Sequence, residues 1–105
     1  MPILPYASLD EMRQAISRKR KLRFMYRKER VEAEPYLLGN FRKTHALVLM
    51  AWATRPVEGW EYYRFAGMRD VEALPEVFTV LRRDFNPYDP RIAGIDTTVR
   101  GSRSA

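Results

Sequence analysis

The stretch EPYLLGNFRKTHALVLMAW, residues 34–52, decides the fold that we predict for this chain. It starts with a Glu-Pro-Tyr step, passes through a Gly-Asn turn and a polar loop at 42–44, and ends in an apolar run. Residues 46–53 are far fewer than the roughly 20 that a membrane-spanning helix needs. A short apolar run of this kind is typical of a central strand buried on both faces.

The flanking segments predict further strands. Leu22, Phe24 and Tyr26 alternate with residues of a basic outer face, which indicates a half-buried strand. Pro35 belongs on a sheet edge or at a bulge. Turn residues separate the remaining apolar segments. The other expected strands cover 30–38, 60–65 and 71–74, and a sixth near 77–81 is an open alternative.

One helix is predicted before the strands. Ser8 and Glu11 fit a capping box, and Leu9, Met12 and Ile16 then recur at helical spacing. We therefore expect an amphipathic helix over 9–20 with its apolar face docked on the strands. A helix followed by five short strands is typical of a small closed or partly open barrel.

The basic balance of the chain suggests a polyanionic partner. The 105 residues carry a formal net charge of +6 and have a pI near 10.0. Within 18–30 only Glu29 opposes the cations, which are Arg18, Lys19, Arg20, Lys21, Arg23, Arg27, Lys28 and Arg30. Such a block is an electrostatic footprint for polyanions, and it is equally a solvated surface that keeps a small protein soluble.

The sequence contains few of the residues and motifs that catalysis requires. The chain has no cysteine, and His45 is its one histidine, so neither a thiolate nor a metal cluster is expected. No nucleophile motif and no Gly-rich phosphate loop occurs. We expect a non-enzymatic protein without cofactor or metal. The first residues do not form a signal peptide, so we also expect a soluble cytoplasmic protein that does not contact membranes.

Aromatic residues lie among the basic ones. Bases of single-stranded nucleic acid stack on aromatic rings while cations neutralise the phosphates. The core is the commoner place for such rings in a barrel of this size, so we expect two or three of them at most to be reachable. The aromatic residues are Phe24, Tyr26, Tyr36, Phe41, Trp52, Trp60, Tyr62 and Tyr63.

Several segments, in order, resemble the WYL domain family. The first strand at 22–26, the Glu-Pro-Tyr-x-Leu-Gly step at 34–39 and the segments 42–45 and 47–52 match its pattern. Gly59-Trp60-Glu61-Tyr62-Tyr63-Arg64-Phe65 resembles the family's Gly-Trp-Arg-x-Phe-Arg segment, and 70–74 and 85–90 follow. The Trp-Tyr-Leu motif that names the family aligns with residues 47–49, where only the final Leu is kept. Glu61 and Gly67 stand where two further family arginines align.

The resemblance implies a mainly β (α+β) fold, a small SH3-like or Sm-like five-stranded barrel with an N-terminal helix. Residues 1–8 are then an N-terminal extension, and 9–85 form the WYL-like domain, with its helix at 9–20 and its barrel at 22–81. The tail, 86–105, is expected to be irregular.

The resemblance also implies a sensor that binds an anionic ligand, single-stranded nucleic acid or a nucleotide, to modulate transcription or defence regulation. Its ligand groove would use Arg64, Arg30, Tyr26 and His45, with Arg42 and Lys43 at the rim. The alternative is a protein–protein interaction module with a vestigial groove, whose barrel edge or helix docks a protein partner or a second copy of the chain.

Overall fold

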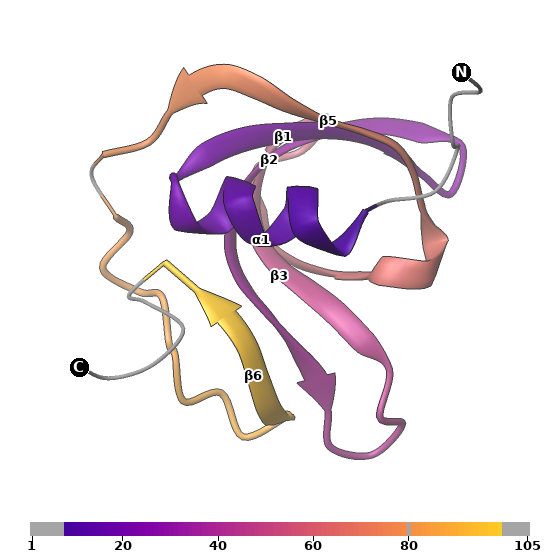
Figure 1. Ribbon diagram of the computed structural model, residues 1–105, viewed down its shortest axis with the longest axis vertical. Helices are drawn as coiled ribbons and strands as arrows, with labels where there is room; N and C mark the ends of the chain where they lie inside the picture. The colour runs from indigo at the N-terminus through magenta and orange to yellow at the C-terminus, as the bar shows by residue number, and fades with distance from the viewer. Residues whose placement is uncertain (1–7, 80, 100–105) are drawn as a thin grey trace.

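The computed structural model describes residues 8–79 and 81–99 of the chain. These residues are mainly β, with one α-helix and an antiparallel six-stranded sheet (Figure 1), which confirms the expected class of a helix followed by strands. The elements are α1 (Leu9–Ser17), β1 (Arg20–Tyr26), β2 (Glu29–Phe41), β3 (Leu47–Arg55), β4 (Gly59–Arg64), the 3-10 turn η1 (Phe65–Gly67), β5 (Met68–Val77) and β6 (Ile92–Thr98). Most of the expected N-terminal extension, 1–7, lies outside the described residues, as does 100–105.

The helix α1 begins as predicted and ends earlier. The Ser8 side chain accepts a hydrogen bond from the Glu11 backbone N–H, and Met12 and Ile16 are fully buried. α1 stops at Ser17 instead of residue 20 because Lys19 takes a left-handed φ of 56° that turns the chain into β1. No helix among the described residues has the length and apolarity to cross a membrane.

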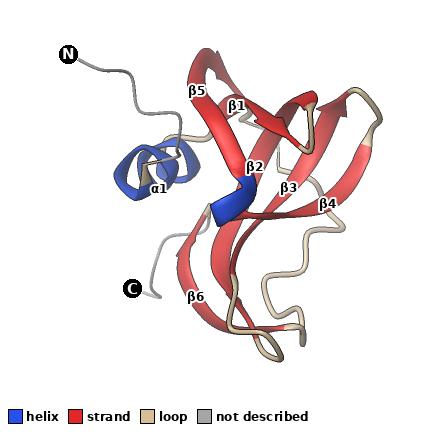
Figure 2. Cartoon of the chain, turned by 90° about the vertical axis from the view of Figure 1, so that its right-hand side faces the viewer, coloured by secondary structure: helices blue, strands red, loops and turns tan. Residues whose placement is uncertain are grey.

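The long strand β2 organises the sheet. One edge of β2 pairs with β3, and the other edge pairs with β1 near Ala33 and with β6 near Leu38. A register shift between Pro35 and Leu37 fits the predicted bulge. Figure 2 shows α1 on one side of the curved sheet, beside the strands that pair with β2. Gly39 lies where β2 meets β6, since a Cβ there would approach the Gly94 carbonyl oxygen to 2.5 Å.

The sheet is open, which corrects the predicted five-stranded barrel. Its order is β4-β3-β2-β1-β5, with β6 also on β2, and no pairing joins β4 to β5 in the described residues. η1 carries the chain away from β4, and β5 then pairs with β1 instead. The sheet still bends over a core, because the Tyr63 ring of β4 lies 5.0 Å from those of Phe24 and Tyr26 on β1.

Two predictions near the C-terminal end are wrong. β5 is one strand over Met68–Val77, longer than the predicted 71–74, and the alternative sixth strand near 77–81 does not form, since residues 78, 79 and 81 lie in no strand. Residues 92–98, predicted to be irregular, form β6. The segment was not recognised as a strand because glycine, here Gly94, is disfavoured in strands. The strand forms because its backbone pairs with the free edge of β2, which local propensity does not take into account.

Residues 81–91, which we call the strap, have no regular structure and lie against aromatic side chains of the sheet. The Arg82 backbone N–H donates to the Tyr36 hydroxyl (2.9 Å), and Arg82 Nε donates to Glu34 (3.1 Å). The Arg82 guanidinium carbon lies 4.0 Å from the centre of the Trp52 ring. Arg82 thus compensates the carboxylate of Glu34, which is only 7% exposed.

Aromatic contacts continue along the strap. The Phe85 ring lies 5.0 Å from Tyr36 and 6.0 Å from Trp60, and Trp60 Nε1 donates to Asp84 (2.9 Å). Such ring pairs add to the stabilisation from area burial. The strap is therefore held in place on its way to β6.

The apolar run at the centre of the sequence is the central strand, as predicted. Leu49 is fully buried in β3 between β2 and β4. We expect Leu49→Ala to lower the free energy of unfolding by about 2–5 kcal/mol, because it leaves a cavity in a packed core. Chemical denaturation measures this loss. Val77→Ala, at a side chain that is 54% exposed, should change stability by less than about 0.5 kcal/mol. Equal losses would contradict the central position of β3.

The ion pair between α1 and β6 gives a second expectation. Arg13 Nε and Nη2 each donate to an Asp96 carboxylate oxygen at 2.9 Å, and these bonds, with that from Thr97, hold the pKa of Asp96 below its ordinary value. A carboxylate whose pKa is lowered by folding stabilises the fold above its unfolded pKa. This contribution is lost as the pH falls through the lowered value.

Asp96→Asn should therefore lower stability at neutral pH and flatten the acid limb of a pH–stability curve from denaturant titrations. The matched control is Asp10→Asn, since Asp10 is 85% exposed and lies 3.6 Å from Arg13. An acid limb in Asp96→Asn as steep as in the parent protein would show that the ion pair contributes nothing.

Candidate functional site: a cationic groove

A groove of about 380 Å³ opens where three segments meet: the β2–β3 turn, the end of β4 and the end of the strap. Four of its lining residues are cationic and none is acidic. We call it the cationic groove, and its lining residues are Phe41, Arg42, Lys43, Thr44, Arg64, Pro90 and Arg91.

The β2–β3 turn holds its backbone through local hydrogen bonds. The His45 N–H donates to the Phe41 carbonyl (2.9 Å), and the Asn40 side-chain amide donates to the His45 carbonyl (3.2 Å). His45 itself takes a left-handed φ of 62°. The turn therefore presents Arg42 and Lys43 from a fixed backbone at its exposed tip.

The third cation, Arg64, comes from the end of β4. Successive side chains of a strand point to opposite faces, so Arg64 shares a face with Tyr62 and Trp60. Its backbone N–H donates to the Tyr26 hydroxyl (3.1 Å), which ties the end of β4 to β1. The Arg64 side chain is exposed and has no ion pair with any described residue.

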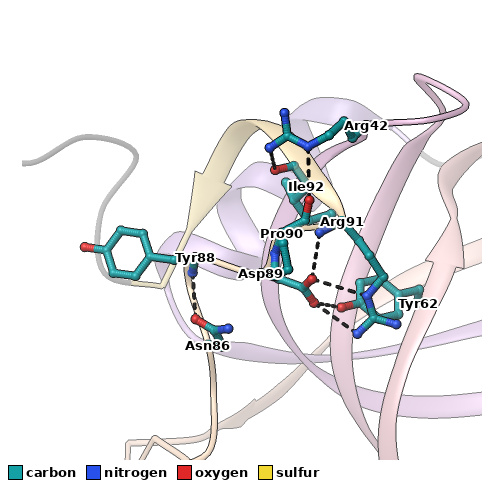
Figure 3. A network of polar contacts seen from close by, with 8 residues as sticks. All are labelled: Arg42, Tyr62, Asn86, Tyr88, Asp89, Pro90, Arg91 and Ile92. Atoms are coloured by element: carbon teal, nitrogen blue, oxygen red, sulfur yellow. Dashed lines mark hydrogen bonds and ion pairs between the residues drawn. The ribbon is translucent and has the colours of Figure 1, made fainter.

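The strap builds the remaining wall around the buried carboxylate of Asp89 (Figure 3). This carboxylate accepts hydrogen bonds from the Tyr62 hydroxyl and from the backbone N–H (2.9 Å), Nε (3.2 Å) and Nη2 (3.3 Å) of Arg91. The Arg91 guanidinium carbon lies 4.8 Å from the centre of the Tyr62 ring. Asp89 thus orients Arg91 and gives it a counter-charge.

Arg42 closes the groove by binding the strap. Its Nε donates to the Pro90 carbonyl (3.1 Å), its Nη2 to the Ile92 carbonyl (3.3 Å), and its backbone N–H to the Arg91 carbonyl (2.7 Å). Figure 3 shows the guanidinium lying over these carbonyl oxygens. Arg42 gains no counter-charge from them, so its positive charge remains available to the groove.

The four cations therefore have two roles. Arg42 and Arg91 hold the walls, whereas Lys43 and Arg64 form no ion pair in the described part of the chain. Phe41 and Pro90 add apolar surface between them. A concave site of this kind suits an anion that carries an apolar or planar body. No group of three metal-ligating side chains is found among the described residues.

The structure brings together three of the six predicted site residues: Arg42, Lys43 and Arg64. His45 lies in the same turn without lining the groove. Tyr26 lines a different hollow, and only its hydroxyl reaches Arg64. Arg30 lies elsewhere, in a separate hollow of about 420 Å³ with Glu32, Thr54, Arg55 and Pro56.

The basic block at 18–30 does not gather at the groove. Arg18 and Arg20 line a separate hollow beside α1, and Arg23 pairs with Glu72 at 2.8 Å. Arg27 lies just beyond the other end of β1. At a rise of about 3.3 Å per residue, it is about 20 Å from Arg20. The block is therefore spread along a strand.

Arg91 is a groove residue that the sequence did not single out, whereas Phe41 was among the aromatic residues named for stacking. Arg91 follows Asp89-Pro90 in the tail that was predicted to be irregular. The sequence signal is the Asp89-Pro90-Arg91 order, because an Asp side chain often accepts a hydrogen bond from the backbone N–H two residues on.

No family model, curated protein or solved structure matches this chain in comparisons with known proteins. The resemblance to the WYL family therefore rests on the sequence segments alone and stays a prediction.

The Asp89 network gives a stability prediction for the groove wall. Asp89→Ala should lower the free energy of unfolding by about 1–3 kcal/mol, since it leaves the Tyr62 hydroxyl and the Arg91 N–H without their acceptor. Denaturant titration measures the loss. The control is Glu58→Ala at an exposed turn position. If Asp89→Ala cost no more than this control, Asp89 would not hold the strap.

Proposed function

We propose that the protein is a non-enzymatic binding module whose cationic groove takes an anionic ligand, either single-stranded nucleic acid or a nucleotide. The observation that carries the proposal is the convergence of four cations from three segments on a groove with no acidic lining residue, and all of them except Arg91 form no ion pair in the described residues. Phosphate oxygens are natural partners of such arginine and lysine groups.

The shape of the groove supports a ligand with a planar body as well as charge. Its volume of about 380 Å³ lies within the roughly 300–1,000 Å³ of small-molecule sites. Phe41 lies half-buried beside it, with its ring 5.3 Å from that of Tyr62. A nucleobase could contact this apolar surface while Arg64 and Lys43 face the phosphate.

A sensor role completes the proposal and rests on the WYL resemblance. In this role the module responds to its ligand and modulates transcription or defence regulation. We also propose a cytoplasmic location, since a chain without cysteine has no disulfides that require an oxidising compartment.

The open sheet favours a second candidate, a protein-interaction module with a vestigial groove. β4 and β5 each lack a second neighbouring strand in the described residues. A free strand edge can pair with a strand of another chain, including a second copy. Binding through a strand edge would depend weakly on salt, whereas phosphate binding depends on it strongly.

The salt dependence of binding tests the first candidate. If Lys43 and Arg64 each neutralise one phosphate of an oligothymidylate, log K should fall with log salt with a slope of about −1.4, at about −0.7 per phosphate. Arg64→Ala should weaken binding by about 1–2 kcal/mol and make the slope shallower by about 0.7. Fluorescence anisotropy at several salt concentrations measures both quantities.

The matched control is Arg18→Ala, which removes the same charge from a different hollow. It should leave both quantities nearly unchanged. An equal effect of the two substitutions would reduce the binding to general electrostatic attraction. If neither oligothymidylate nor any nucleotide binds at low salt, the protein-interaction candidate replaces this one.

A further inference from the structure

A second hollow, of about 330 Å³, has a different character from the cationic groove. It opens between the β1–β2 turn, the β3–β4 turn and β4. Its walls contain three tyrosines, so we call it the tyrosine hollow. The lining residues that matter here are Tyr26, Arg27, Glu29, Glu61 and Tyr63.

Two carboxylates in the tyrosine hollow have no cationic partner. Glu29 and Glu61 are exposed, and neither forms an ion pair with any described residue. Arg27 is the one cation among the residues that line the hollow. In a chain of net charge +6, this hollow therefore carries more acidic than basic side chains.

Tyr63 adds an acceptor oxygen to the wall of the hollow. Its side chain is buried, at 6% exposure, yet its hydroxyl makes no hydrogen bond within the described part of the chain. The hydroxyl oxygen is not one of the fully buried side-chain atoms without a partner, so it reaches the open space of the hollow. Burial, with Glu61, Tyr26 and Glu29 adding to it, raises the pKa of Tyr63 to about 12. The hydroxyl therefore stays protonated and keeps its oxygen lone pairs free to accept a hydrogen bond.

The tyrosine rings add a preference for positive charge. The Tyr26 and Tyr63 rings meet edge to face at 5.0 Å, and the Arg27 guanidinium carbon lies 5.5 Å from the centre of the Tyr26 ring. Cations are attracted to the faces of such rings. The Tyr26 hydroxyl already accepts the Arg64 N–H, so Tyr63 carries the acceptor that remains free.

We propose that the tyrosine hollow binds an organic ammonium group. An ammonium has three N–H donors and a compact charge, and Glu29, Glu61 and Tyr63 offer three acceptors from two strands. A metal ion suits the hollow less well, because no three ligating side chains come together in the residues that the structure describes. The ammonium site is independent of the cationic groove and of the function proposed for it.

An NMR titration of the whole protein with n-butylammonium chloride tests the site, with 1-butanol as a neutral probe of similar size. The ammonium should shift the Tyr63 and Tyr26 ring signals, and butanol should not. Glu61→Gln and Glu29→Gln should each weaken ammonium binding about tenfold, as expected for the loss of one charge-assisted hydrogen bond. Glu76→Gln, the same charge change at an exposed β5 position outside the hollow, should leave the affinity unchanged.

Tyr63→Phe keeps the ring and removes only the hydroxyl. It should also weaken butylammonium binding, because the third acceptor is lost. An equal response to butylammonium and butanol would overturn the proposal. An affinity that is the same in Glu61→Gln, Glu29→Gln and Glu76→Gln would overturn it as well.

Two natural sources of an ammonium group can then be separated. Tighter binding of a lysine-bearing peptide than of butylammonium would identify a protein side chain as the ligand. Tighter binding of spermidine would identify a free polyamine. Either result supports an ammonium site.

Discussion

The structure depends on keeping the backbone of β2 paired along its whole length. From Val31 to Gly39 this strand is almost entirely buried, and a buried peptide group without a hydrogen bond is costly. β3 satisfies one edge of β2, while β1 and β6 divide the other between them. Because β6 must return to β2, the chain between β5 and β6 has to cross the sheet. The strap and the cationic groove are consequences of that crossing.

Buried charge then fixes where the strap lies. Glu34 and Asp89 are both carboxylates with less than a tenth of their surface exposed, and each is compensated by an arginine of the strap, Arg82 and Arg91. Removing one partner of such a pair leaves an uncompensated buried charge, which is strongly destabilising. Asp89 and Arg91 both belong to the strap, so it is the Glu34–Arg82 pair and the bond from the Tyr62 hydroxyl to Asp89 that specify one position of the strap on the sheet. A groove whose walls are fixed in this way is formed before a ligand arrives, which lowers the entropic cost of binding.

Local sequence patterns predicted the elements that depend on neighbouring residues in the chain. The apolar run at 46–53 identified the central strand, and Ser8 with Glu11 identified the start of the helix. Contacts between distant residues were beyond such signals: β6 exists because β2 has a free edge, and Arg91 becomes a groove residue through bonds to Asp89 and Arg42. Three groove cations were expected from the family resemblance. Arg30 was expected there too, yet its place in β2 carries it to another surface.

The alternation of β4 explains how a small basic protein can present two hollows of different charge. Trp60 and Arg64 point to the side covered by the strap, whereas Glu61 and Tyr63 point to the opposite side and line the tyrosine hollow, which Tyr62 also borders. A shift of one residue in the pairing of β4 with β3 would exchange the two sets of side chains. Packing of Tyr63 against Phe24 and the bond from Arg64 to the Tyr26 hydroxyl hold the register. The same contacts that position the core therefore keep the cation of one hollow apart from the carboxylate of the other.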